Sequence, residues 1–124
     1  GVGMTKTVLT IDDSRTMRDM LLLALEGAGY TVIQAVDGVD GLETLAAKGA
    51  DVVITDINMP RMDGFGFIEG MRANPDHRTT PVLVLTTESD AEKKQRARAA
   101  GATGWIVKPF DPVKLVDAVR RVAA

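Results

Sequence analysis

The chain has 124 residues, with 15 Lys and Arg against 17 Asp and Glu, so its formal net charge is −2 at pH 7. This length suits one domain with a sizeable hydrophobic core and leaves no room for a second. The even charge balance argues against direct DNA binding. The sequence has no cysteine, no signal-peptide pattern and no apolar run near the about 20 residues of a membrane span. We therefore expect a cytoplasmic protein without membrane insertion.

The first three residues, Gly1-Val2-Gly3, precede Met4 and are interpreted as a remnant of recombinant expression. They play no part in the predicted fold. We expect a single domain over residues 4–124, because no internal repeat, low-complexity tract or linker interrupts that stretch.

Short apolar runs rich in β-branched residues alternate along the chain with segments of helical spacing. Runs of this kind are typical of parallel strands that are covered on both faces. In chain order, the predicted elements are strand Val8–Ile11, helix Ser14–Ala28, strand Thr31–Ala35, helix Gly38–Lys48, strand Val52–Thr55, helix Phe65–Ala73, strand Val82–Thr86, helix Asp90–Ala100, strand Gly104–Val107 and helix Pro112–Val122. Strict alternation with short connections predicts an α/β fold with a doubly wound parallel sheet, right-handed crossovers and helices on both faces.

The helix boundaries rest on capping residues and on apolar periodicity. Asp111 before Pro112 favours a helix start, and the glycine-rich segment 27–29 favours a helix end. In the first helix, one apolar stripe comprises Met17, Met20, Leu21, Ala24 and Leu25, and the outward face comprises Arg15, Arg18, Asp19 and Glu26. This spacing places at least one of the two methionines in the core.

Charged or hydroxyl side chains lie at the carboxyl ends of four predicted strands: Asp12 and Asp13, Asp56, Thr86, and Lys108. Because the carboxyl ends of parallel strands meet at one edge of a sheet, we expect these side chains to converge in one crevice. Taken alone, an Asp-Asp pair after a strand is more often a helix cap, and a single Asp is more often a turn residue. The combination favours a functional site.

Three carboxylates in one crevice need a compensating charge, since neighbouring carboxylates repel by roughly 1–4 kcal/mol per pair. A hard divalent cation supplies that charge. Mg²⁺ suits the crevice because it prefers oxygen ligands and readily shares a phosphate oxygen.

The order of these residues resembles that of the receiver domains of two-component response regulators, in particular the stand-alone chemotaxis type. The matching residues are Asp12-Asp13, then Asp56-Ile57-Asn58-Met59-Pro60-Arg61-Met62-Asp63-Gly64, then Thr86, then Lys108-Pro109, together with the chemotaxis-like stretch Ile11-Asp12-Asp13-Ser14-Arg15-Thr16-Met17-Arg18. The resemblance implies a flavodoxin-like (βα)5 sheet in the strand order 2-1-3-4-5. It also implies a protein that switches a binding surface and is not a turnover enzyme.

The resemblance implies roles for the crevice residues. Asp56 would accept a phosphoryl group as a carboxylate nucleophile. Asp13, Asp56 and the backbone carbonyl of Asn58 would hold Mg²⁺, with Asp12 acting through water.

The remaining phosphoryl oxygens would be bound by Thr86 and Lys108, and the bond between Lys108 and Pro109 would be cis. In the family, an aromatic residue on the fifth strand swings inward as the threonine moves. Trp105 stands at that position in place of the more usual Tyr or Phe. The alternative for Trp105 is simple core filling.

Three further residues would tune dephosphorylation. Asn58 and Glu88 would border the path of the hydrolytic water, which suggests a short-lived phosphoryl group. Thr87 stands where a small Ala or Gly is common, so its β-branched side chain is expected to slow hydrolysis and to hinder small donors.

The implied partners are a histidine kinase as phosphodonor, a downstream target such as a flagellar motor switch protein, and a phosphatase. The output surface would comprise the fourth helix, fifth strand and fifth helix, where basic residues lie beside Trp105: Lys93, Lys94, Arg96 and Arg98. Such a surface suits an acidic or amphipathic partner, and an ordinary solvated helix face is the alternative. We expect a monomer, with His77 exposed and inert.

Other functions remain open at this point. A haloacid-dehalogenase-type phosphatase requires an Asp at the position of Asn58. It also carries a cap over its substrate, and this chain has no room for one. A flavodoxin-like nucleotide binder wants a phosphate loop rich in Ser, Thr and Gly, and a scaffold receiver normally lacks part of the acid, threonine and lysine set. A receiver of this kind can also serve as a phosphorelay intermediate, as a phosphate sink, or as a part of a longer regulator.

Overall fold

The computed structural model describes residues 5–124, so the expected expression remnant at residues 1–3 lies outside the described residues. The strands are β1 (Thr7–Ile11), β2 (Thr31–Ala35), β3 (Val52–Thr55), β4 (Val82–Thr86) and β5 (Gly104–Val107). The helices are α1 (Arg15–Gly27), α2 (Gly38–Lys48), α3 (Gly64–Ala73), α4 (Ala91–Ala100) and α5 (Pro112–Ala123), with a short 3₁₀ helix η1 (Pro75–His77) after α3. Within residues 5–124, none of these helices is both long and apolar enough to cross a membrane.

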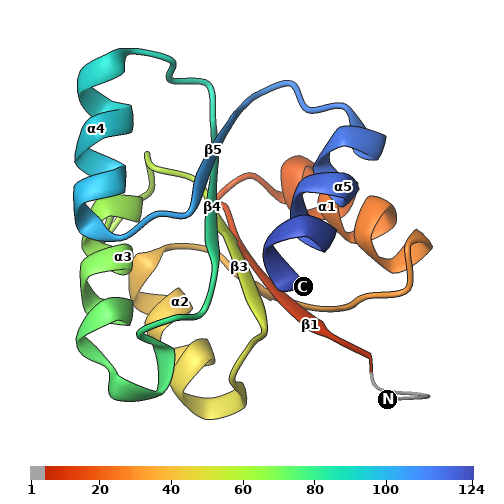
Figure 1. Ribbon diagram of the computed structural model, residues 1–124, viewed down its shortest axis with the longest axis horizontal. Coiled ribbons are helices and arrows are strands. Elements are labelled where there is room, and N and C mark those ends of the chain that lie inside the picture. Colours follow the sequence, from red (N-terminus) through yellow and green to blue (C-terminus); the bar gives the residue numbers. More distant parts are fainter. Residues whose placement is uncertain (1–4) are drawn as a thin grey trace.

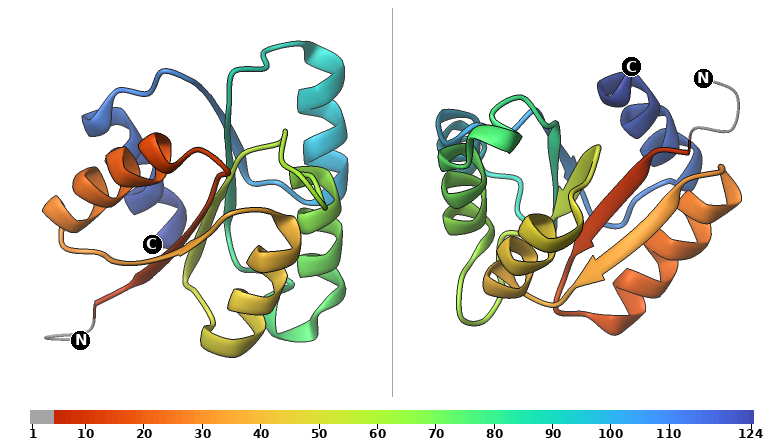
Figure 2. Two further views of the ribbon diagram at one scale, coloured as in Figure 1. Left: turned by 180° about the vertical axis from the view of Figure 1, so that it is seen from behind. Right: turned by 90° about the horizontal axis from the view of Figure 1, so that it is seen from below.

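The strands form one parallel sheet in the order β2-β1-β3-β4-β5, which confirms the predicted doubly wound fold. Helices α1 and α5 cover one face of the sheet, and α2, α3 and α4 cover the other (Figures 1 and 2). Each predicted element is present, and the helix and strand boundaries agree to within a residue or two.

The core lies in two layers, one on each face of the sheet. On the α2–α4 side the largest buried side chains belong to α3, with Phe67, Ile68 and Met71 packed against β1 and β3. On the other side, Leu21 and Leu25 of α1 pack with α5. The strands β3 and β4 are buried along their whole length, whereas the edge strands β2 and β5 are only partly covered. The expected coverage of both faces therefore holds for the central strands and is wrong for the two edges.

Side chains cap four of the five helices at their starts. Ser14, Asp37, Asp63 and Asp111 each accept a hydrogen bond from a backbone N–H in the first turn. These bonds satisfy N–H groups that have no partner inside the helix. Asp90 precedes α4 without such a bond.

The predicted apolar stripe of α1 is wrong at Met20, which is 43% exposed. Leu21 and Leu25 are the buried residues of this helix, and Met17 packs partly against the same core. Because successive residues turn by about 100° around a helix, Met20 lies more than 100° from the midpoint of Leu21 and Leu25. The expectation that at least one of Met17 and Met20 contributes to the core is confirmed.

The expectation that His77 is exposed is also wrong, since this residue is only 8% exposed. Its segment forms η1, which Asn74 caps by accepting a hydrogen bond from the Asp76 N–H. The turn directs the imidazole inward, where Nδ1 lies 3.0 Å from the Thr80 Oγ1. The Arg72 guanidinium donates to the carbonyls of His77 and Thr80, at 2.8 and 2.7 Å, and so holds the turn in place.

The start of α3 requires a glycine. A Cβ at Gly64 would overlap the Asp56 carbonyl oxygen and would lie 2.9 Å from the Ile57 Cα. The Gly64 N–H also donates to the Ile57 carbonyl at 2.8 Å, so neither backbone segment can move away independently.

We therefore expect Gly64→Ala to lower the free energy of unfolding by about 2 kcal/mol or more, because the added methyl group displaces backbone. Gly27→Ala is the matched control, since a Cβ at Gly27 meets nothing within 4 Å. That control should be neutral or stabilising by up to about 1 kcal/mol, because alanine has the better helix propensity. Urea unfolding of both variants tests the expectation, and equal stabilities would contradict it.

Candidate functional site

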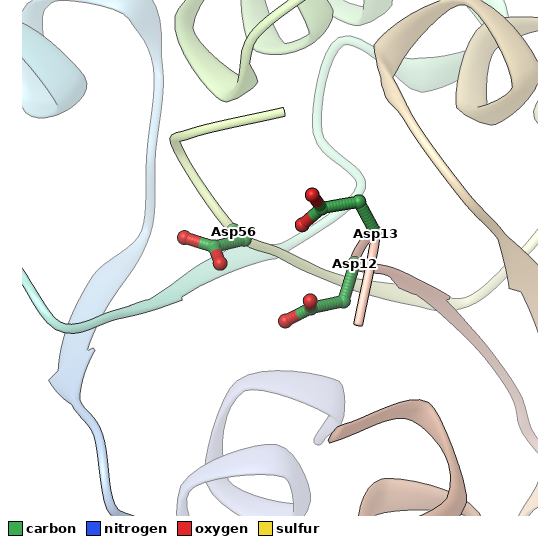
Figure 3. Close-up of side chains that lie close together, drawn as sticks. All are labelled: Asp12, Asp13 and Asp56. Carbon is green, nitrogen blue, oxygen red and sulfur yellow. The ribbon is translucent and has the colours of Figure 1, made fainter. Parts of the chain in front are cut away.

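The sheet register brings the two acidic strand ends together. Ile11 of β1 pairs with Thr55 of β3, so the next residues, Asp12 and Asp56, leave the sheet side by side. One carboxylate oxygen from each of Asp12, Asp13 and Asp56 lies within 4.8 Å of the other two (Figure 3). Asp12 and Asp56 are only 1% and 9% exposed, whereas Asp13 faces solvent. The predicted acidic crevice is present.

Lys108 enters this crevice from the end of β5. Its Nζ lies 2.8 Å from the Asp12 Oδ2 and 2.7 Å from the Asp56 Oδ2, and the Lys108–Pro109 bond that precedes α5 is cis. Burial alone would lower the pKa of Lys108, but the hydrogen bonds to Asp12 and Asp56 outweigh it and raise the pKa. The ammonium is therefore firmly charged at neutral pH.

Burial raises the pKa of Asp12, and the hydrogen bond from Lys108 counteracts part of that rise. The other Asp12 oxygen accepts from the Ser14 N–H at 2.9 Å. Asp56 is fixed from two sides, because its Oδ1 accepts from the Ile57 N–H at 2.6 Å while its Oδ2 contacts Lys108. The carboxylate of Asp56 is thus held in one orientation.

Arg18 was expected on the outward face of the first helix, and the structure shows that its side chain turns back toward the crevice. Its Nη1 donates to the backbone carbonyl of Asp12 at 2.7 Å. Helical spacing does not reveal this contact, since it depends on how the Asp12–Ser14 turn leads into α1. The contact ties α1 to the backbone at the end of β1.

The donor set fits Mg²⁺. Three carboxylates and one ammonium leave a net charge of −2 when all are ionised, and a divalent cation cancels it. Asp12, Asp13 and Asp56 offer the oxygen ligands that Mg²⁺ prefers. Asn58 is exposed two residues beyond Asp56 in the same loop, and its backbone carbonyl is the predicted further ligand. The assignment of these ligands stays a prediction.

Glu88 links the loop after β4 to its neighbours. Its carboxylate accepts from the Asn58 Nδ2 at 3.2 Å and pairs with Lys93 at 3.1 Å. Its N–H donates to the Thr86 Oγ1 at 3.3 Å, and its carbonyl accepts from the Trp105 Nε1 at 3.0 Å. Thr86, the candidate phosphoryl-binding threonine, is thus connected to Trp105 through one residue.

The basic side chains of α4 have different environments. Lys93 pairs with Glu88, and the Arg96 guanidinium lies 4.0 Å from the ring centroid of Phe65 in α3. Lys94 and Arg98 border a small hollow beside Trp105. Two of the four predicted surface charges are therefore engaged within the domain.

With this fold and this site, the chain belongs to the response regulator receiver domain family, whose model matches residues 8–120. It is 37% identical over 116 residues to the "Probable chemotaxis protein CheY" of Rhizobium etli, covering 93% of this chain and 90% of that protein. It is 33% identical over 113 residues to "Protein PilG" of Pseudomonas aeruginosa, covering 91% and 84% of the two chains.

Comparison with a solved structure supports the same family assignment. The chemotaxis response regulator CheY4 of Vibrio cholerae superposes with a TM-score of 0.91 at 44% identity, covering 96% of this chain and 99% of that one. The predicted family is therefore confirmed. Receiver domains are signalling proteins, not turnover enzymes, and they act between histidine kinases and downstream targets.

Replacement of Lys108 by Met should raise the pKa of Asp12 further, because the ammonium that lowers it is lost. A carboxyl group with a raised native pKa binds its proton more tightly in the folded state, so stability falls as the pH rises through that pKa. We expect Lys108→Met to lose more stability than the unmodified protein as the pH rises from 3.8, the ordinary value for Asp, toward neutrality.

The measurement is urea unfolding across this pH range, together with an NMR titration of the Asp12 carboxyl group. Lys114→Met serves as the control, since Lys114 is exposed on α5. An Asp12 titration midpoint that is the same in all three proteins would show that Lys108 does not set its pKa.

Proposed function

We propose that this receiver takes a phosphoryl group from a histidine kinase onto Asp56 with the help of Mg²⁺ and then changes a protein-binding surface. The observation that carries the proposal is the position of Asp56, whose Oδ2 lies 2.7 Å from the Lys108 Nζ in a crevice lined by two further carboxylates. Mg²⁺ supplies the charge that lets a phosphoryl oxygen approach these carboxylates. The loose phosphoryl-transfer transition state needs mainly positioning and charge stabilisation.

In the transfer, a carboxylate oxygen of Asp56 attacks the phosphorus of the donor phosphohistidine. The P–N bond breaks, its electron pair returns to the imidazole nitrogen, and a P–O bond to Asp56 forms. Lys108 would release Asp56 and bind a phosphoryl oxygen as a point charge, and the Thr86 hydroxyl would donate to another. Asp12, Asp13, Asp56 and the Asn58 carbonyl would hold the metal.

The movement of Thr86 would be transmitted through Glu88. The Glu88 N–H donates to the Thr86 hydroxyl, and the Glu88 carbonyl accepts from the Trp105 indole. The output surface proposed is α4, β5 and α5, with an acidic or amphipathic partner segment. Asn58 and Glu88 are joined at 3.2 Å, and we propose that they border the path of the hydrolytic water. Thr87 is exposed beside them and would narrow the approach to Asp56.

The phosphodonor would dock on the apolar surface beside the crevice. Met20 and Leu23 of α1 are 43% and 76% exposed, and with Phe110 and Pro112 they line a shallow apolar hollow at the start of α5. We propose that a donor helix that presents a phosphohistidine to Asp56 also contacts this hollow. The exposure of Met20 thus suits a partner contact.

Chemotaxis or motility signalling is the pathway proposed, in the cytoplasm and with a flagellar motor switch protein as one candidate target. This part of the proposal rests on the relatives, one of which is described as "Probable chemotaxis protein CheY". Relay and phosphate-sink roles use the same site and stay open. The chain also matches the "Probable transcriptional regulator ycf27" of Porphyridium aerugineum, at 35% identity over only 47% of that protein. The domain can therefore form part of a longer regulator.

Asp56→Asn should abolish labelling when the protein is incubated with a phosphorylated histidine kinase and Mg²⁺, because an amide oxygen is a far weaker nucleophile. Intact mass spectrometry should show one added phosphoryl group on the unmodified protein and none on the variant. Asp76→Asn, which removes an exposed aspartate from η1, is the control and should be labelled normally. Labelling of Asp56→Asn, or none of the unmodified protein, would refute the proposed function.

Trp105 fluorescence should change when Mg²⁺ and a phosphoryl analogue are added together, since the indole contacts the loop that binds Thr86. The signal is specific because Trp105 is the only tryptophan of the chain. Thr86→Ala is the control and should show the effect of Mg²⁺ without the further effect of the analogue. An identical response in both proteins would exclude the threonine-to-tryptophan connection.

A further inference from the structure

The loop that follows Asp56 is tied to the start of α2 by an ion pair between Arg61 and Asp37. The Arg61 Nε lies 2.7 Å from the Asp37 Oδ2, and its Nη2 lies 3.0 Å from the Asp37 Oδ1. This fork-to-carboxylate arrangement fixes direction as well as distance. Asp37 is only 3% exposed, whereas the Arg61 side chain remains largely open to solvent.

Arg61 adopts an unusual backbone conformation. Its φ is 64°, and within residues 5–124 it is the one non-glycine residue with a positive φ. A side chain is disfavoured in this left-handed region, and such a residue persists only where the surrounding structure imposes it. Two contacts supply that constraint: the bonds of the Arg61 guanidinium to Asp37, and the bond between the Gly38 N–H and the carbonyl of Met62, the residue after Arg61.

The backbone of the loop also contacts α2 directly. The Gly38 N–H donates to the Met62 carbonyl at 3.0 Å. A Cβ at Gly38 would lie 2.7 Å from the Met62 carbonyl oxygen and 2.8 Å from the Met62 Cβ, so the approach depends on glycine. The loop is therefore bound to the β2–α2 connection by two side-chain bonds and one backbone bond.

Asp37 is itself held by α2, because its Oδ1 accepts from the Asp40 N–H at 2.9 Å. The hydrogen bond from Arg61 lowers the pKa of Asp37, and the N–H of Asp40 lowers it further. The ionised Asp37 carboxylate is therefore able to accept both guanidinium bonds of Arg61.

We propose that Arg61 is a positioning residue for the phosphoryl and metal site, because its bond to Asp37 holds the loop that carries Asp56 and the Asn58 carbonyl. Only three residues separate Asp56 from Pro60, which precedes the anchored Arg61. Asp56 is fixed on the sheet side by the register of β3, and Arg61 fixes the far end of the same loop. This inference rests on the proposed function, since it concerns the Mg²⁺ ligands of that site.

The test is the Mg²⁺ affinity of the folded, metal-free protein, measured by calorimetry without any phosphodonor. Arg61→Gln should weaken Mg²⁺ binding by about fivefold or more, Asp37→Asn should do the same, and the double variant should be little worse than either single one. Arg61→Lys keeps a charge but loses the fork, so its affinity should lie between those of Arg61→Gln and the unmodified protein. Arg78→Gln is the charge-matched control on an exposed arginine and should bind normally.

Arg61→Gly removes the ion pair but still allows the positive φ at this position, because glycine adopts it freely. The variant therefore tests the ion pair without straining the backbone. It should weaken Mg²⁺ binding as Arg61→Gln does, and hydrogen exchange of the amides at 57–63 should be faster in both metal-free variants. If the Arg61 variants bind Mg²⁺ normally and only their melting temperature falls, Arg61 stabilises the fold without positioning the metal ligands. That result would overturn the proposal. Since no donor is used, a failure of Asp56 to take phosphate would leave this result unaffected.

Discussion

One ammonium group between two buried carboxylates organises the functional end of this domain. The Lys108 Nζ lies within 2.8 Å of both Asp12 and Asp56, and the exposed Asp13 completes the acidic cluster. Three carboxylates against one ammonium carry a net charge of −2 when all are ionised, and two of the three carboxylates are buried. A divalent cation relieves this repulsion. The sheet maintains this state, because the pairing of Ile11 with Thr55 leaves Asp12 and Asp56 no freedom to separate. The site therefore combines a firmly held Asp56, the proposed phosphoryl acceptor, with uncompensated negative charge.

The loops around the cluster are held by a few contacts that join distant parts of the chain. Glu88 connects Asn58 to Thr86 and Trp105, and Arg61 connects the loop after β3 to the start of α2. A change at the phosphoryl site would reach α4 and β5 through the first of these connections. The second holds the side of the loop that faces α2, so a rearrangement of the loop would be directed toward β4 and β5. Such an arrangement suits a two-state switch on a rigid sheet.

Sequence alone predicted the sheet and the composition of the crevice, because both follow from local patterns. Apolar runs with short connections specify parallel strands, and strand ends place Asp12, Asp56 and Lys108 at one edge. The failures have two causes. Met20 was wrong because the predicted stripe was wider than the buried face of the helix, which centres on Leu21 and Leu25. The burial of His77 depends on a 3₁₀ turn, and periodicity does not encode such tertiary contacts. The contacts of Arg18 and Arg61 join segments that helical spacing and motif order treat as independent.

Calorimetric titration with Mg²⁺ tests the central claim most directly, since that claim concerns the charge of the crevice. The unmodified protein should bind one Mg²⁺ per chain at neutral pH, and Asp13→Asn should bind it much more weakly because one negative charge and one oxygen ligand are lost. Asp19→Asn, which removes an exposed aspartate from α1, should bind like the unmodified protein. Absence of saturable binding, or equal affinity in Asp13→Asn and the unmodified protein, would contradict the account.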